Sequence, residues 1–404
     1  MSQKLLDVKQ LSVAFPQSSD KIPKAHRGYT AHKTHGNPSR FGSKDDGRLP
    51  QQGSLPSSAQ QPSSLPSSTP DLPNSLGFAV NNVSFSVSAG KTLCLVGESG
   101  CGKSLTALSV MKLLPETARL VSGQCLFQGR DLFQMTPESL SSVRGNDIGM
   151  IFQDPMSSLN PVMRVGAQAA EPLRRHLGLD KKAALQTIEE LFARVGIHPA
   201  KERIHEYPHQ LSGGLRQRVV IAQALACQPK LIIADEPTTA LDVTVQKQIL
   251  GLLHSLVYEM GSGMLLISHD LSVVSACADD VAVMYAGSIV EQGPVAKILE
   301  NPLHPYTQGL LASRISLLND GAGRNLEGKS GFICGDKDGG SGGHCRQLET
   351  IPGTVPSLWG RPRGCVFHPR CPKAEERCRL EEPALDYERA QKGEHVSSCF
   401  FALG

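Results

Sequence analysis

The segment Gly97-Glu-Ser-Gly-Cys-Gly-Lys-Ser104, which we call the phosphate loop, decides the fold of this chain. It fits the pattern G-x-x-x-x-G-K-[ST] and lies between the apolar run Leu93–Val96 and a stretch of helical periodicity that begins at Ser104. Glycines let the backbone fold closely enough for its N–H groups to surround a β-phosphate, and the N-terminus of the next helix adds partial positive charge. The alternative is a glycine-rich turn that binds nothing. Because strand and helix flank the loop as the motif requires, we predict nucleotide binding.

The side chains of the loop indicate how a nucleotide would be held. Lys103 is expected to bridge the β- and γ-phosphates, and the hydroxyl of Ser104 is expected to ligate Mg²⁺. Cys101 lies beside Lys103 and a helix N-terminus, a position that would favour its thiolate and make it reactive. We prefer to interpret Cys101 as a tolerated side chain at a variable position, and we predict no catalytic role for it.

Short apolar runs on both sides of the loop indicate a parallel sheet. Leu231–Ala234 and Met264–Ile267 resemble Leu93–Val96, and such runs are typical of strands that are buried on both faces. Residues 160–225 lack these runs and are expected to be mostly helical. Alternation of apolar and polar residues over 5–15, which resumes at Phe78, predicts further strands.

Two polar stretches interrupt these elements. Of the 26 residues from Pro50 to Ser75, 14 are Ser or Pro, and the preceding stretch is polar and basic. Residues 17–75 cannot bury enough apolar surface to offset their ordering entropy, so we expect them to be disordered. Residues 319–345 hold nine glycines and predict a flexible loop.

Composition excludes several classes of protein. The 404 residues carry 41 Lys and Arg against 38 Asp and Glu, a formal charge of +3, which gives no argument for nucleic-acid binding. No run approaches 18 apolar residues, so no bilayer span is expected, and the N-terminus lacks the apolar core of a secretion signal. Eleven cysteines without an export signal indicate thiols or metal ligands rather than disulfides.

An acidic pair ends the second of the predicted buried strands. Asp235 and Glu236 follow Leu231–Ala234 directly. At a strand end beside the phosphate loop, Asp235 is expected to hold Mg²⁺ through water, and Glu236 to polarise the attacking water. Considered alone the pair could simply cap a loop, but the phosphate loop makes catalysis the better interpretation. His269 follows the run Met264–Ser268, where an imidazole could reach a γ-phosphate.

The segment Leu211-Ser-Gly-Gly-Leu-Arg-Gln217, which we call the signature segment, predicts a second anion site. It opens a helical stretch with exposed backbone N–H groups. Two phosphate-binding segments more than a hundred residues apart indicate a nucleotide shared between two chains.

Together these residues resemble one family, the ATP-binding subunits of ABC transporters, over about 5–16 and 76–318. The shared motifs are, in chain order, Walker A (97–104), Gln153 in Ile-Phe-Gln-Asp-Pro, the signature segment, Walker B (231–236), the D-loop ending at Asp242 and the switch residue His269.

The resemblance implies an α/β fold: a P-loop NTPase (RecA-like) core with an antiparallel β subdomain, an α-helical signature subdomain and a Cys-rich C-terminal extension. We expect the ABC ATP-binding domain over 1–16 and 76–318, with the helical subdomain at about 155–225. The insertion would occupy 17–75 and the extension 319–404.

The resemblance also implies the residues of the site. Glu236 would act as the base, His269 would steady the γ-phosphate, and Gln153 would contact Mg²⁺ and the water. Phe15 would stack on adenine, although the long insertion directly after it departs from the family pattern. The implied Mg²⁺ ligands are Ser104, Gln153 and Asp235. The implied nucleotide contacts are Phe15, Gly97, Glu98, Ser99, Gly100, Cys101, Gly102, Lys103, Ser104, Gln153, Asp235, Ser212, Gly213, Gly214, Gln217 and Asp242.

Narrower sequences resemble the oligopeptide/dipeptide/nickel importer subfamily: 152–161, 207–214 and 304–308. So do four cysteines near the end, Cys365, Cys371, Cys378 and Cys399, which in dipeptide and oligopeptide ATPases are linked to a [4Fe–4S] cluster. On chemistry alone four thiolates could equally hold Zn²⁺, or could stay unligated. The spacing lacks the tight C-x2-C pairs of zinc ribbons, which favours iron and sulfur. Cys334 and Cys345 are not assigned to this cluster.

The resemblance finally implies partners and cargo. It implies two transmembrane permease subunits, a second ABC ATPase in a heterodimer or homodimer, an external solute-binding protein, and a place on the cytoplasmic face of the inner membrane. Peptides are the implied cargo, with nickel or another small solute as the alternative.

Two other classes of protein fit the sequence less well, and no nucleic-acid partner is expected. A chromosome ATPase of the SMC type would place a long coiled coil between Lys103 and Ser212, which are only 109 positions apart. Intact Glu236 and His269 argue against a regulatory module that binds ATP without hydrolysing it.

Overall fold

The computed structural model describes residues 3–17, 76–239, 241–319, 332–333, 346–347 and 351–402. It divides into two compact units, one formed by residues 1–15 and 77–404 and the other by residues 16–76. The predicted disordered insertion from residue 18 onward, and most of the Gly-rich stretch 319–345, lie outside the described residues. The two larger sheets and the helices belong to the first unit.

A seven-stranded mixed sheet forms the centre of this unit, in the order β13-β10-β9-β3-β8-β7-β6. Its strands are β3 (Thr92–Val96), β6 (Ile148–Ile151), β7 (Leu231–Asp235), β8 (Gly263–Ser268), β9 (Asp280–Tyr285), β10 (Ser288–Pro294) and β13 (Val396–Ser397). From β9 to β6 the neighbouring strands are parallel, whereas β10 and β13 add an antiparallel edge. All residues of β3, β7 and β8 are buried, because helices or a second sheet cover both faces. The predicted α/β fold is confirmed.

Each face of the main sheet has its own core. Leu93 and Leu95 of β3 point into the cluster that holds α1 (Lys103–Val110) and the second sheet. Cys94 and Val96 point the other way, into the cluster that holds α9 (Val243–Glu259) and α10 (Leu271–Cys277). This alternation follows from the two-residue period of a strand.

The second sheet has four strands in the order β2-β1-β4-β5. They are β1 (Lys4–Pro16), β2 (Leu76–Ser88), β4 (Arg119–Phe127) and β5 (Arg130–Asp131). The β1–β4 and β4–β5 pairs are antiparallel. Leu6 and Val8 of β1 are fully buried, so this sheet covers one face of the main sheet.

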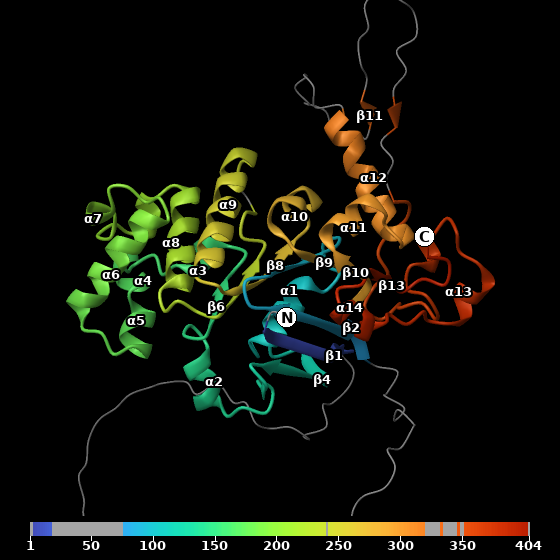
Figure 1. Ribbon diagram of the computed structural model, residues 1–404, viewed down its shortest axis with the longest axis horizontal. Coiled ribbons are helices and arrows are strands. Elements are labelled where there is room, and N and C mark those ends of the chain that lie inside the picture. The colour runs from blue at the N-terminus through green and yellow to red at the C-terminus, as the bar shows by residue number, and fades with distance from the viewer. Residues whose placement is uncertain are drawn as a thin grey trace, which may run out of the picture. The chain divides into compact units, whose positions relative to one another are not determined.

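Helices fill the chain between β6 and β7. They are α3 (Pro155–Ser158), α4 (Val165–Ala169), α5 (Glu171–His176), α6 (Lys181–Arg194), α7 (Ala200–Arg203), the 3-10 turn η1 (Pro208–Gln210) and α8 (Gly213–Leu225), while α2 (Pro137–Val143) precedes β6. Asp180 caps α6 by accepting from the N–H groups of Lys182 and Ala183. In Figure 1 the helices α5, α6 and α7 lie at the β6 end of the main sheet, away from the C-terminal extension.

The C-terminal extension packs on the opposite edge of the main sheet. It follows α11 (Val295–Glu300) and α12 (Pro305–Asn319), and it contains β11 (Phe332–Ile333), β12 (Arg346–Gln347), the 3-10 turn η2 (His368–Arg370), α13 (Glu376–Leu380), α14 (Tyr387–Gln391) and β13. Strand β13 pairs with β10, and the Tyr387 hydroxyl donates to Asp7 Oδ1 of β1 at 2.6 Å. The extension therefore shares the core of the cassette. Among the described helices, none has the length and apolar character needed to cross a bilayer.

Candidate active site

The phosphate loop connects β3 to α1, as its sequence predicts. Gly102 has φ +107°, and a Cβ there would lie 2.3 Å from the carbonyl oxygen of Ala79. A Cβ on Gly97 would lie 2.2 Å from the carbonyl oxygen of Met284. Only glycine fits at these two positions, because each combines a close backbone approach with the sharp turn of the loop.

Lys103 reaches back across the loop. Its Nζ donates to the carbonyl oxygens of Gly97 at 2.8 Å and Glu98 at 3.0 Å, and only 4% of the residue is exposed. Its positive charge therefore lies inside the curve of the loop, where the predicted β- and γ-phosphates would meet it. Ser99 and Gly100, by contrast, are exposed at the rim.

Two of the predicted Mg²⁺ ligands meet beside the loop. The Ser104 hydroxyl at the start of α1 donates to Asp235 Oδ1 at the end of β7, at 2.9 Å. Burial raises the pKa of Asp235, while the hydrogen bond from Ser104 opposes that rise. A hydroxyl and a carboxylate are oxygen donors of the kind that Mg²⁺ uses together with phosphates and water. The donor set therefore fits the ion.

Three side chains converge on the carboxylate of Glu236. Its Oε2 accepts from Gln153 Nε2 at 3.1 Å and from Thr239 Oγ1 at 2.9 Å, and it lies 3.2 Å from His269 Nδ1. Gln153 thus contacts Glu236 directly, so that three of the predicted catalytic residues meet at one point. Thr239 was not predicted, although its place three residues after Glu236 in the same loop could have indicated it.

The backbone of Glu236 is constrained as well as its side chain. It has φ +44°, a left-handed conformation that side chains other than glycine rarely adopt. Its N–H donates to the carbonyl of Ile267 at 3.1 Å, which ties the end of β7 to the end of β8. Glu236, Thr239 and His269 line a cavity of about 80 Å³, large enough for several water molecules.

The signature segment lies at the start of α8. Ser212 caps this helix by accepting from the N–H of Leu215 at 3.4 Å, and Ser212 and Gly213 are exposed. None of its residues lines the cavity at Glu236. Gln217 is only 1% exposed, so within this chain its side chain faces the core, and its contact with a nucleotide stays a prediction.

Three further predicted contacts have distinct surroundings. Asp242 caps α9 by accepting from the N–H groups of Thr244 and Val245, which gives it a structural role in this chain. Phe15 is half-buried against the core of the second sheet, and its stacking on adenine stays a prediction. Cys101 is 1% exposed, and burial raises the pKa of its thiol even though Lys103 lowers it, so the thiolate considered as the alternative for this residue is disfavoured. A buried neutral thiol is inert.

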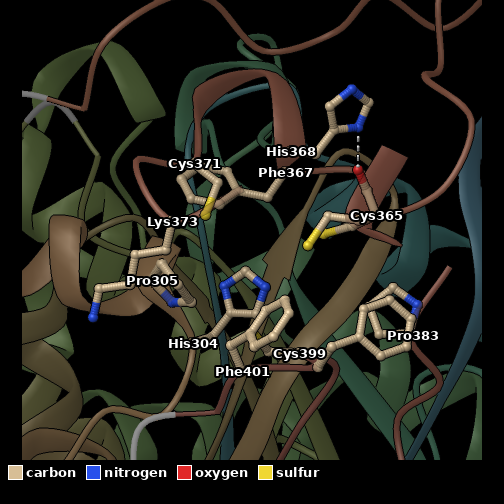
Figure 2. A pocket seen from close by; sticks show the side chains of 12 residues that line it. His304, Pro305, Cys365, Phe367, His368, Cys371, Lys373, Pro383, Cys399 and Phe401 are labelled. Atoms are coloured by element: carbon tan, nitrogen blue, oxygen red, sulfur yellow. Dashed lines mark hydrogen bonds between the residues drawn. The ribbon is translucent and has the colours of Figure 1, made fainter. Parts of the chain in front are cut away.

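The four clustered cysteines, Cys365, Cys371, Cys378 and Cys399, all line one small cavity of about 10 Å³, which we call the Cys-lined pocket. Figure 2 shows it with His304 and Phe367 among the residues around it. Burial raises the pKa of Cys365 to about 11, and the neighbouring thiols add to the rise. Within the described residues no three His, Cys, Asp or Glu side chains are placed as a metal-binding group.

Comparisons with known proteins agree with this geometry. Residues 80–239 match the family model described as ABC transporter, and residues 290–331 and 341–378 match that of the oligopeptide/dipeptide transporter, C-terminal region. A putative peptide import ATP-binding protein of Brucella ovis is 48% identical over 326 residues, which cover 79% of this chain and 90% of the relative. The oligopeptide transport ATP-binding protein AppD of Bacillus subtilis is 45% identical over 308 residues, or 76% and 87% of the two chains. A dimeric bacterial ABC transporter cassette is similar with a TM-score of 0.50 and 25% identity, over 55% of this chain and 94% of that one.

Proposed function

The chain belongs to the ATP-binding subunits of ABC transporters, in the group of peptide import ATP-binding proteins, and on this premise we propose that its ATP hydrolysis powers the import of di- and oligopeptides through membrane permease subunits. The observation that supports this best is the meeting of Gln153, Thr239 and His269 at the carboxylate of Glu236. That carboxylate lies next in sequence to Asp235, which contacts Ser104 at the phosphate loop.

The chemistry follows from these contacts. Lys103 binds the β- and γ-phosphates, and Ser104 and Asp235 would hold Mg²⁺, which neutralises phosphate charge when bound. Glu236 accepts the proton of a water as its oxygen attacks the γ-phosphorus, the bond from that phosphorus to the β,γ-bridging oxygen breaks, and ADP and phosphate form. Gln153 and Thr239 fix the direction of the carboxylate, and His269 steadies the transferred phosphoryl group.

A second cassette completes the site in this proposal. The exposed Ser212 and Gly213 at the start of α8 present backbone N–H groups outward, where they can meet a nucleotide held by another chain. ATP then lies between the phosphate loop of one cassette and the signature segment of the other, and hydrolysis releases the pair. The second cassette is a related ATPase or another copy of this chain.

The proposed partners are two transmembrane permeases and an external solute-binding protein. The cassette would bind the permeases at the cytoplasmic face of the membrane, as a peripheral subunit. The peptide cargo rests on the relatives named above and on the match to the oligopeptide/dipeptide C-terminal region.

We also propose the four thiols of the Cys-lined pocket as ligands of a [4Fe–4S] cluster, with Zn²⁺ as the alternative. Four cysteines are the donor set of both groups, and all four line one cavity. Since they are not placed as a metal-binding group in the described residues, binding would require the thiols to move together. Anaerobically purified protein is expected to be brown and to contain iron and sulfide. Colourless protein with one equivalent of zinc would decide for the alternative.

The peptide proposal is tested with the intact membrane complex, purified with its permeases and reconstituted in liposomes with its solute-binding protein. Di- and oligopeptides are expected to stimulate Mg²⁺-dependent phosphate release and to accumulate inside, as measured by mass spectrometry. Stimulation by nickel salts and not by any peptide would overturn the cargo while leaving the ATPase assignment intact.

A further inference from the structure

The C-terminal extension touches the phosphate loop itself. Arg370 of η2 forms a two-pronged ion pair with Glu98, the second residue of the loop: Nη1 lies 2.9 Å from Oε2 and Nη2 lies 3.2 Å from Oε1. The two residues are 272 positions apart in sequence. The Arg370 side chain is only 6% exposed, and that of Glu98 is 27% exposed, so water screens the pair weakly.

All five N–H donors of Arg370 have acceptors. Besides the two oxygens of Glu98, Nη1 lies 3.5 Å from the Tyr285 hydroxyl, Nη2 donates to the carbonyl of Ile351 at 3.2 Å, and Nε donates to the carbonyl of Pro352 at 2.8 Å. A guanidinium offers five donors in a fixed planar fork. The guanidinium of Arg370 is therefore held at each of its donors, and it in turn orients the carboxylate of Glu98.

A second contact fixes the backbone of the same residue. The N–H of Glu98 donates to the hydroxyl of Tyr306, a fully buried residue near the start of α12, at 3.0 Å. The carbonyl of Glu98 accepts from Lys103 Nζ at 3.0 Å. The side chain, the N–H and the carbonyl of Glu98 thus each have a partner, and one of these is the lysine that meets the phosphates.

Arg370 directly precedes Cys371, one of the residues that line the Cys-lined pocket. It lies between Cys365 and Cys371 in the turn η2, whose backbone bonds join His368 N to Cys365 O at 3.1 Å and Cys371 N to His368 O at 3.3 Å. Phe367 of this turn packs against Tyr306 and against His304, with ring centroids 5.4 Å and 5.7 Å apart, and Figure 2 shows Phe367 and His304 around the same pocket. A rearrangement of Cys365 or Cys371 would act on this turn, and Arg370 is part of it.

We propose that Arg370 is a positioning residue for the phosphate loop. Through Arg370, the arrangement of the thiols in the Cys-lined pocket sets the affinity of the cassette for ATP. The contact acts on the shape of the loop and not on the reacting atoms, since Glu236 and its partners lie beyond the ends of β6, β7 and β8. The affinity for ATP changes when Arg370 is removed, whereas turnover at saturating ATP does not.

The experiment measures the Kd of ATP by titration calorimetry on the full chain, together with KM and kcat for its hydrolysis. Arg370→Met is expected to raise Kd and KM about 10-fold, within the usual range of coupling between two sites, with kcat within about twofold of wild type. Tyr387→Phe is the matched control, because it removes a different tie between the extension and the cassette, far from the loop. Its Kd is expected to stay within about twofold of wild type.

Two outcomes would overturn the proposal: an unchanged Kd in folded Arg370→Met, or an equal loss in Tyr387→Phe. If Arg370→Met does not fold, Arg370→Lys decides, since a lysine keeps the charge but loses the two-pronged contact and should still weaken binding. In a double-mutant cycle with Glu98→Gln, the two changes are expected to be non-additive, and additive effects would contradict direct coupling.

The link to the thiols is tested in the same assay. Cys371→Ser is expected to raise the Kd of ATP several-fold when Arg370 is present and to have no further effect in Arg370→Met. An equal rise in Kd in both backgrounds would show that the thiols do not act through Arg370. The inference rests on ATP binding at the phosphate loop, which Lys103→Ala tests separately. If Lys103→Ala still binds ATP, the assignment of the ATP site is wrong. If Lys103→Ala loses ATP binding but Arg370→Met does not, the ATP site stands and only the role of Arg370 is refuted.

Discussion

Replacing Glu236 by Gln tests the assignment of the base most directly. The amide has the shape of the carboxylate, and its oxygen can still accept from Gln153 and Thr239, which lie 3.1 Å and 2.9 Å from Glu236 Oε2. Folding and ATP binding should therefore change little. The lost property is the capacity to take up a proton, which is worth about 10²- to 10⁴-fold in rate, or about 3–5 kcal/mol of transition-state stabilisation.

The assay is Mg²⁺-dependent phosphate release at saturating ATP, with dimer formation followed by light scattering. Glu236→Gln is expected to bind ATP with the wild-type Kd and to accumulate as an ATP-bound dimer, because release of the pair requires hydrolysis. Glu259→Gln is the matched control, since that side chain is 59% exposed and pairs with the exposed Arg194. A kcat for Glu236→Gln within a few-fold of wild type would refute the assignment of Glu236 as the base.

Three further perturbations have defined outcomes. Gly102→Ala is expected to cost more than about 2 kcal/mol in denaturant unfolding and to abolish ATP binding, because its Cβ would meet Ala79 in addition to the strain of a positive φ. Gly100→Ala, with open space around it, should cost only the strain, about 1–2 kcal/mol, and equal losses would contradict this. Because burial raises the pKa of Asp235, the folded state binds the proton more tightly than the unfolded state and loses stability as pH rises through that pKa. Asp235→Asn should therefore raise the melting temperature at neutral pH and lower Mg²⁺-dependent turnover. A lower melting temperature would show that the sign of this effect is wrong. Phe192→Ala in the core of the helices between β6 and β7 should cost about 3–5 kcal/mol in denaturant unfolding, and a loss below 1 kcal/mol would mean that its site collapses around the smaller side chain.

Local features of this chain could be predicted from its sequence because their causes are local. The glycines of the phosphate loop form a motif within eight residues, although the carbonyl oxygens that exclude a Cβ at Gly97 and Gly102 come from Met284 and Ala79. The runs that became β3, β7 and β8 are apolar because both their faces are covered. The acidic pair follows β7 directly, so the sheet edge that carries it was also predictable. Short-range geometry of this kind depends little on the rest of the fold.

The burial of Gln217 on helix α8 follows from the sequence pattern around it. Gln217 lies on α8 three and four residues before Val220 and Ile221, which are both buried. Residues at these spacings share a helix face, so the helical period already placed Gln217 toward the core and away from the exposed Ser212. Its nucleotide contact stays a prediction, whereas the helical period accounts for its burial within this chain.

The contacts of Glu98 could not be predicted from sequence at all. The motif leaves this position open, as one of four unspecified residues between the two glycines of the phosphate loop. Its ion pair depends on where β13 joins the main sheet and on how η2 then packs beside α12, and neither follows from local composition. A residue that the motif leaves free is therefore the one through which the rest of the chain can act on ATP binding. Variable positions inside the phosphate loop are where control of its affinity can be added without disturbing the groups that carry out hydrolysis.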